Sequence, residues 1–178
     1  MRLTPILSPR SPLLKLAYFI SKRTFGKALS AFQVIYARST PIFMVATKII
    51  STQKKLSLDQ HTKLLIGNFV SHLNDCSFCS NINEYLAVKD NMEWKKIIDL
   101  MNFRSSDRFS PKEKAMLSYL EEVTLTKTAT DDCFGELKKH FSDKEIIEIT
   151  WLNAVENFFN LQAKPLGLGS DMLKYEKK

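Results

Sequence analysis

The hydrophobic and polar residues along this chain follow a helical period. Apolar runs are long, the polar breaks between them are short, and nothing alternates with a period of two over the length of a strand. One apolar stripe is formed by Leu58, His61, Leu65, Phe69 and His72. A second, which turns polar halfway, is formed by Ile146, Ile149, Asn153, Asn157 and Asn160. The pattern predicts an all-α fold.

Capping signals mark several helix starts. A Ser is followed three residues later by Gln or Glu at 57–60, 110–113 and 142–145, and Thr130 precedes two aspartates. Pro111 adds a proline in a first helical turn. The sequence predicts helices near 12–23, 28–38, 41–53, 58–74, 76–88, 91–102, 111–127, 131–140 and 143–163.

Length and composition favour one compact domain over residues 1–178. The chain has 178 residues, of which 44% are hydrophobic, so it can bury a core without disulfides or metals. No internal repeat or low-complexity linker divides it. Prolines near the start, and Gly167 and Gly169 after Pro165, lead us to expect that 1–11 and 168–178 are loosely ordered.

The charge and hydropathy patterns argue against a nucleic-acid partner, a membrane span and secretion. Of the formal net charge of +7, the excess lies in residues 1–60, where 10 Lys or Arg face a single Asp. These cations are scattered among apolar residues, which favours a solvated face over a nucleic-acid site. No run approaches the ~20 apolar residues of a membrane span, and the N-terminus does not fit a secretion signal. Three cysteines, an odd count, make the cytoplasm the expected location.

Cys76 and Cys79 carry the strongest chemical signal. On a helix, a spacing of three puts both sulfurs on one face, within reach of a disulfide. We expect Asp75 to cap this helix and Cys76 to lie in its first turn, where the free N–H groups stabilise a thiolate. Three interpretations stay open: packed core cysteines, half of a zinc site, or a redox pair, which we favour. CxxC alone is only moderately specific, because its thioredoxin setting follows a strand.

The wider sequence around the pair resembles the alkylhydroperoxidase D-like (AhpD-like) branch of the carboxymuconolactone decarboxylase family. The resemblance rests on Ser71-His72-Leu73-Asn74-Asp75-Cys76-Ser77-Phe78-Cys79, and extends through 109–115 and 141–150 to 157–160 and 165–167. It covers most of the chain. It implies an all-helical single-domain bundle, a homo-oligomer that is often a trimer or hexamer, and a thiol-dependent peroxidase or disulfide reductase of antioxidant type with no cofactor and no bound metal.

Residue by residue, the resemblance implies that Cys79 attacks a peroxide and that Cys76 condenses with the resulting sulfenic acid. Two positions depart from the family pattern: Asn83 stands where the family has a general-base His, and Leu64 where it has a relay Glu. An amide can hydrogen-bond a thiolate but cannot take its proton. The predicted site therefore comprises Cys76, Cys79, Asn83 and His72, the last as a candidate substitute base.

The predicted activity is reduction of hydroperoxides or of a partner disulfide by a cycling dithiol. The alternative is a diverged, weakly active or inactive member that acts as a binding or scaffold oligomer. Cys133 is expected to be a packed or surface thiol. The asparagines of the second stripe are expected at a subunit contact, along a channel to the thiols, or facing solvent.

Overall fold

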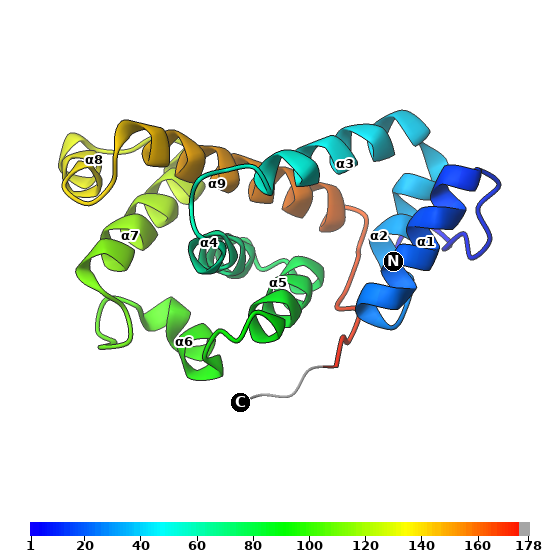
Figure 1. The fold of residues 1–178 in the computed structure, drawn as a ribbon, viewed down its shortest axis with the longest axis horizontal. Coiled ribbons are helices and arrows are strands. Elements are labelled where there is room, and N and C mark those ends of the chain that lie inside the picture. The colour runs from blue at the N-terminus through cyan, green and yellow to red at the C-terminus, as the bar shows by residue number, and fades with distance from the viewer. Residues whose placement is uncertain (175–178) are drawn as a thin grey trace.

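The secondary structure is entirely helical within residues 1–174, the part of the chain that the computed structural model describes (Figure 1). The α-helices are α1 (Pro12–Phe25), α2 (Ser30–Val34), α3 (Thr40–Gln53), α4 (Gln60–Leu73), α5 (Ser77–Lys89), α6 (Trp94–Ile98), α7 (Pro111–Thr126), α8 (Asp131–Lys138) and α9 (Asp143–Ala163). Two short 3-10 helices, η1 (Tyr36–Arg38) and η2 (Asp99–Asn102), follow α2 and α6. The all-α prediction is confirmed. The expected helices at 28–38 and 91–102 are each divided into a short α-helix and a 3-10 turn.

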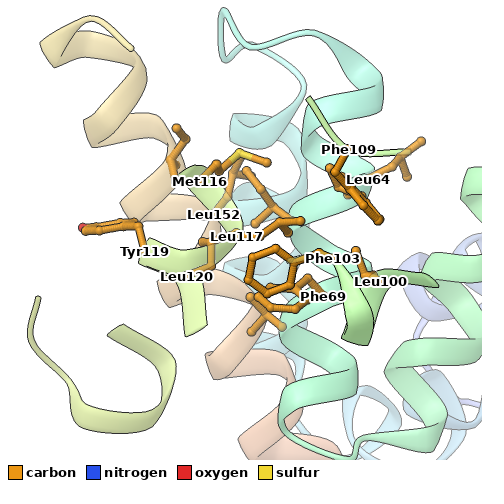
Figure 2. Packing of buried hydrophobic residues seen from close by; sticks show 14 of the residues in the cluster. Leu64, Phe69, Leu100, Phe103, Phe109, Met116, Leu117, Tyr119, Leu120 and Leu152 are labelled. Carbon is orange, nitrogen blue, oxygen red and sulfur yellow. The ribbon is translucent and has the colours of Figure 1, made fainter. Parts of the chain in front are cut away.

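Helix α4 is the centre of the larger hydrophobic core. It packs against α5, α7 and α9, and Figure 1 shows it end-on with these helices around it. Residues 64–71 are all buried, as expected of a helix that is covered on every side. Phe69 is fully buried and meets the edge of Phe103 with ring centroids 5.4 Å apart (Figure 2). The helix that leads into the cysteine pair is therefore held rigidly.

A second buried cluster joins the N-terminal helices to the cysteine pair. Leu14 of α1, Val34 of α2 and Phe43 of α3 belong to the same cluster as Cys76 and Cys79. Both cysteines are almost fully buried, with 1% and 5% of their surfaces exposed. The N-terminal region thus forms one wall of the cysteine site.

Three of the four predicted caps are present, and one is wrong. The capping boxes at Ser110 and Ser142 both form, and the Thr130 hydroxyl accepts a hydrogen bond from Cys133 N. Ser57, in contrast, does not cap α4, which begins at Gln60 behind the cap Asp59. The Ser57 hydroxyl instead binds a carboxylate from a distant part of the chain, that of Glu148.

Glu148 of α9 holds the turn before α4. Its carboxylate accepts hydrogen bonds from Ser57 N at 3.0 Å, from the Ser57 hydroxyl at 2.9 Å and from Leu58 N at 3.0 Å. Burial acts to raise the pKa of Glu148, but these hydrogen bonds outweigh it, so the pKa is lowered. The Ser57 hydroxyl is therefore bound to α9 instead of capping α4.

The first residues are held against the rest of the chain, in contrast to the expectation that 1–11 are loosely ordered. Arg2 N donates to Leu166 O at 2.8 Å, and Ile6 N donates to Gln33 O at 3.0 Å. The Tyr18 hydroxyl also donates to Ile6 O at 2.6 Å. Backbone groups that the helical pattern leaves free are thus satisfied by long-range contacts.

The segment after α9 is also packed as far as it is described. Asp171 is 4% exposed, and its carboxylate accepts from both Ser30 N at 2.8 Å and the Ser30 hydroxyl. Lys27 Nζ lies 3.5 Å from the same carboxylate, and Leu173 is buried in the second cluster. Residues 168–174 therefore differ from the predicted loose segment 168–178, and 175–178 lie outside the described residues.

Candidate functional site

The cysteine pair lies where α4 ends and α5 begins. Asp75 adopts a left-handed backbone conformation with φ 48°. Asp75 N donates to His72 O and Cys76 N donates to Ser71 O, both at 2.9 Å. These two bonds are the Schellman pattern that closes a helix C-terminus. Asp75 therefore ends α4, and the prediction that it caps α5 is wrong.

The cap of α5 is Cys76 itself, which corrects its expected place in the first turn. The Cys76 sulfur accepts a hydrogen bond from Cys79 N at 3.4 Å. The two cysteines are joined by a disulfide, with their Cα atoms 5.3 Å apart. In the reduced protein, the same N–H group and the positive end of α5 favour a thiolate at Cys76.

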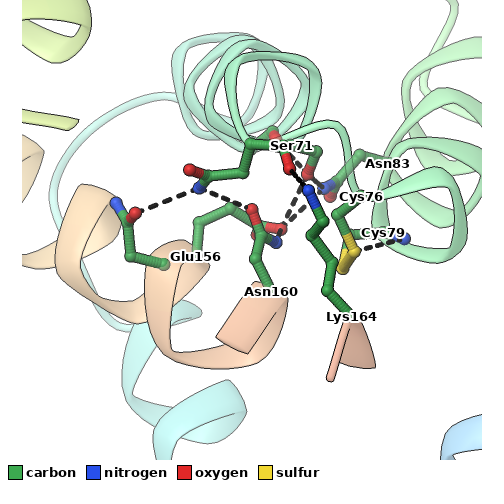
Figure 3. Close-up of a disulfide and its surroundings, with 10 residues drawn as sticks. Ser71, Cys76, Cys79, Asn83, Glu156, Asn160 and Lys164 are labelled. Atoms are coloured by element: carbon green, nitrogen blue, oxygen red, sulfur yellow. Dashed lines mark hydrogen bonds between the residues drawn. A yellow bond between two sulfur atoms is a disulfide. The ribbon is translucent and has the colours of Figure 1, made fainter. Parts of the chain in front are cut away.

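A polar cluster lies beside the disulfide at the junction of α4, α5 and α9. We call Ser71, Asn83, Glu156 and Asn160 the Glu156 cluster (Figure 3). Glu156 Oε1 lies 2.7 Å from the Ser71 hydroxyl and accepts from Asn160 Nδ2 at 2.8 Å and from Asn83 Nδ2 at 3.3 Å. Asn83 Nδ2 also donates to Ser71 Oγ at 2.8 Å. Glu156 was not anticipated from the sequence, because it lies 73 residues from Asn83.

The environment of Glu156 favours its neutral form. Burial raises the pKa of the carboxyl, and the hydrogen bonds from Ser71, Asn160 and Asn83 only partly oppose that effect. Buried carboxyls with raised pKa values are suited to holding and releasing a proton near neutral pH. Glu156 is thus a titratable group close to the cysteine pair.

The asparagines of the second stripe face inward. Asn153 and Asn160 are 2% exposed. Asn74, at the end of α4, donates to Asn157 Oδ1 at 3.0 Å and to Asn160 Oδ1 at 2.8 Å. Of the three expected settings for the stripe, solvent exposure is excluded. Asn157 and Asn160 instead tie α9 to the turn that precedes Cys76, and Asn153 accepts a hydrogen bond from the Thr124 hydroxyl of α7.

His72 belongs to a different pair. Its Nδ1 lies 2.8 Å from Asn68 O, and its Nε2 lies 3.3 Å from Glu84 Oε1. The hydrogen bond with Glu84 is the main cause that raises the pKa of His72, against the effect of burial. A carboxylate partner that favours the protonated form makes His72 a weaker candidate for a base, and its catalytic role stays a prediction.

A cavity of about 290 Å³ lies next to the Glu156 cluster. Its lining includes Leu64 and Gly67 of α4, Asn83 of α5, and Leu152 and Glu156 of α9. Gly67 is needed for this packing, because a Cβ there would lie 2.9 Å from Asn83 Oδ1. Leu64 and Asn83, the two positions that depart from the family pattern, therefore face one cavity together with Glu156.

Cys133, on α8, packs against the larger hydrophobic core, whereas Cys76 and Cys79 belong to the second cluster. Burial, assisted by a hydrogen bond with Glu122, raises the pKa of Cys133 to about 12. Cys133 is therefore a protonated, half-buried thiol.

Within residues 1–174, no group of three or more His, Cys, Asp or Glu side chains is arranged to hold a metal ion. None of the helices in that part of the chain is long and apolar enough to cross a membrane.

Two bacterial proteins resemble the chain in sequence. The uncharacterised protein YnjA of Escherichia coli (strain K12) is 24% identical over 156 residues, which cover 86% of this chain and 85% of YnjA. The uncharacterised protein YdfG of Bacillus subtilis (strain 168) is 28% identical over 109 residues, which cover 60% of this chain and 74% of YdfG. No protein-family model matches the chain.

Solved structures match over most of the chain. ATU0492 of Agrobacterium tumefaciens, whose description proposes an antioxidant defence role as AhpD, is 26% identical, with a TM-score of 0.73 over 80% of this chain and 98% of its own. A peroxidase-related protein of Silicibacter sp. TM1040 is 17% identical, with a TM-score of 0.85 over 96% and 92%. The debrominase Bmp8 is 16% identical, with a TM-score of 0.83 over 95% and 91%.

The fold and the cysteine geometry define an all-α protein with a CxxC motif at the start of a helix. Together with the structural matches, they show that the chain has the AhpD-like fold. Because this fold is shared by a debrominase and by peroxidase-related proteins, the fold alone does not assign an activity.

Proposed function

We propose that the protein is a thiol-dependent oxidoreductase that cycles Cys76 and Cys79 between dithiol and disulfide and reduces hydroperoxides or a partner disulfide. The observation that carries this proposal is the pair itself: the two cysteines are joined at the cap of α5. The cytoplasm is the proposed location, because a reducing compartment returns the disulfide to the dithiol.

The proposed cycle balances without a cofactor. The Cys79 thiolate attacks the outer oxygen of ROOH, the O–O bond breaks, and the alkoxide takes a proton to leave as ROH. The Cys76 thiolate then attacks the sulfur of the Cys79 sulfenic acid, and hydroxide takes a proton and leaves as water. An external dithiol supplies two electrons and two protons to reopen the disulfide.

The geometry at the cap of α5 gives the two cysteines different surroundings. Cys76 accepts the N–H of Cys79, so its thiolate is stabilised and ready to attack the sulfenic acid. Cys79 is left as the thiol that must be deprotonated by another group. Asn83, one helical turn further on, cannot do this.

Removing the Cys79 thiol tests this function directly. We expect Cys79→Ser to reduce hydroperoxide consumption by at least about 100-fold in the presence of a dithiol reductant, because the attacking atom is lost. Cys133→Ser is the matched control and should retain wild-type turnover. Equal loss in both variants, or turnover that survives Cys79→Ser, would contradict the assignment of the pair.

A binding or scaffold role is the second candidate. Asn83 and Leu64 stand where the family resemblance implies a base and a relay, which favours low activity. A wild-type protein that consumes no peroxide and reduces no protein disulfide would support this role.

We propose that the protein forms a homo-oligomer, either a trimer or a hexamer. Large apolar side chains are exposed on α1, α3 and α9; they include Leu16, Phe19, Ile20, Met44, Val45, Ile147, Trp151 and Leu161. Surfaces of this kind usually cover one another between subunits. Sedimentation is expected to give about three or six times the 20.5 kDa chain mass. A single species of chain mass at micromolar concentration would contradict it.

A further inference from the structure

The cavity beside the cysteine pair contains a carboxyl group that the proposed cycle has not yet used. Glu156 reaches it from α9, whereas Leu64 and Asn83 line it from α4 and α5. By the family resemblance, a carboxylate and an imidazole would be expected at positions 64 and 83. The carboxylate of this cavity is therefore supplied from a different helix.

We propose that Glu156 is the proton-exchanging group of the dithiol site and acts on Cys76 and Cys79 through Ser71 and Asn83. The inference rests on the proposed dithiol cycle but not on peroxide as its substrate. Because Glu156 acts through other residues, it is a positioning residue and not a catalytic one.

Two links connect Glu156 to the sulfur-bearing residues. Through α4, the Ser71 hydroxyl lies 2.7 Å from Glu156 Oε1, and Ser71 O accepts from Cys76 N at 2.9 Å. Through α5, Asn83 donates to Glu156, and it follows Cys79 by one helical turn on the same helix. A change in the charge of Glu156 therefore acts on the two helix segments that carry the cysteines, where screening by water is weak.

The other charged groups near Glu156 are already engaged or lie across the cavity. Lys63 Nζ donates to Leu56 O at 2.9 Å, and Lys164 Nζ donates to Asn74 O. The other titratable groups that line the cavity with Glu156 are Lys54 and Lys63, and Lys164 after α9 binds Asn74, which Asn160 of the cluster also contacts. Burial is the main cause of the raised pKa of Glu156, and the hydrogen bonds from Ser71, Asn160 and Asn83 act against it.

The proton balance follows from the dithiol cycle. Reduction of the disulfide takes two electrons and two protons from the external dithiol. With Cys76 as a thiolate, one proton goes to the Cys79 thiol and the other to Glu156, because a thiolate near the carboxyl raises its proton affinity. Oxidation reverses this, and the carboxyl releases its proton to the cavity. Glu156 therefore has a higher pKa in the dithiol protein than in the disulfide protein.

The pH dependence of the dithiol–disulfide equilibrium tests the inference without peroxide. The protein is equilibrated with dithiothreitol between about pH 6 and pH 8, where the reference thiols are mostly protonated, and the oxidised fraction is measured by alkylation and mass spectrometry. In the wild type, the reduced protein holds the same two protons that dithiothreitol gives up, one on Cys79 and one on Glu156, so the equilibrium constant for reduction is expected to vary less than about twofold between the two Glu156 pKa values.

Glu156→Gln, which imitates the protonated carboxyl in both states, leaves a reduced pair that holds only one proton, so its equilibrium constant is expected to rise by about tenfold per pH unit over the same range. Glu156→Asp should restore the nearly constant profile of the wild type, because it keeps the carboxyl. Asp143→Asn is the matched control: it removes an exposed carboxylate from α9, and its profile should follow the wild type. Circular dichroism melts establish that each variant is folded.

The outcomes separate this inference from the proposed function. A Glu156→Gln profile that matches the wild type overturns the role of Glu156, even if peroxide is consumed. A Glu156-dependent profile without peroxide or disulfide turnover supports the inference and contradicts the proposed activity. A pair that cannot be reduced and reoxidised overturns both.

Discussion

Asn83→His is expected to raise hydroperoxide turnover at neutral pH by about 100-fold, the lower end of what a positioned general base contributes. The imidazole would lie one helical turn from Cys79, within the cavity that Asn83 now lines. Glu156, whose Oε1 accepts from Asn83 at 3.3 Å, is placed to hold the new ring in one orientation. Adding Leu64→Glu at the same cavity should increase the gain.

The measurement is the initial rate of peroxide consumption with excess dithiol, together with the pH dependence of Cys79 alkylation. Asn83→Gln is the control, because it changes the size of the side chain without adding a base. If wild-type Cys79 already alkylates as a thiolate below about pH 6, and Asn83→His gains nothing, the protein is not a weakened thiol peroxidase.

Phe69→Ala is expected to lower the free energy of unfolding by about 3–5 kcal/mol, the usual cost of deleting a buried phenylalanine. Phe69 is fully buried at the centre of α4, and its ring contacts Phe103 edge to face. The cavity left behind lies among helices that hold each other in place and cannot close easily. Because α4 also carries Ser71 and leads into Cys76, the variant should loosen the cysteine site.

Urea unfolding followed by circular dichroism measures this loss. Ile66→Val, one turn earlier on the same buried helix, is the matched control and should cost about 0.5–1.5 kcal/mol. A cost below about 1 kcal/mol for Phe69→Ala would show that the larger core does not depend on α4.

Contacts within one helical turn could be predicted because they depend on local spacing alone. Four predicted contacts join residues that are three apart, and all four are present. They are the capping boxes at Ser110 and Ser142, the Thr130 cap, and the contact between Cys76 and Cys79. The helical period likewise predicts the all-α fold. The resemblance predicted the AhpD-like fold.

Contacts between distant segments could not be predicted from spacing. Ser57 resembles a capping residue, yet it binds Glu148, 91 residues away. Asp75 ends α4 with a left-handed turn, so the cap of α5 passes to Cys76. Glu156 meets Ser71 and Asn83 only because α9 packs against α4 and α5. The chemical surroundings of the cysteine pair therefore depend on how three helices pack, and hydrophobic periodicity carries no information about which side chains then face one another.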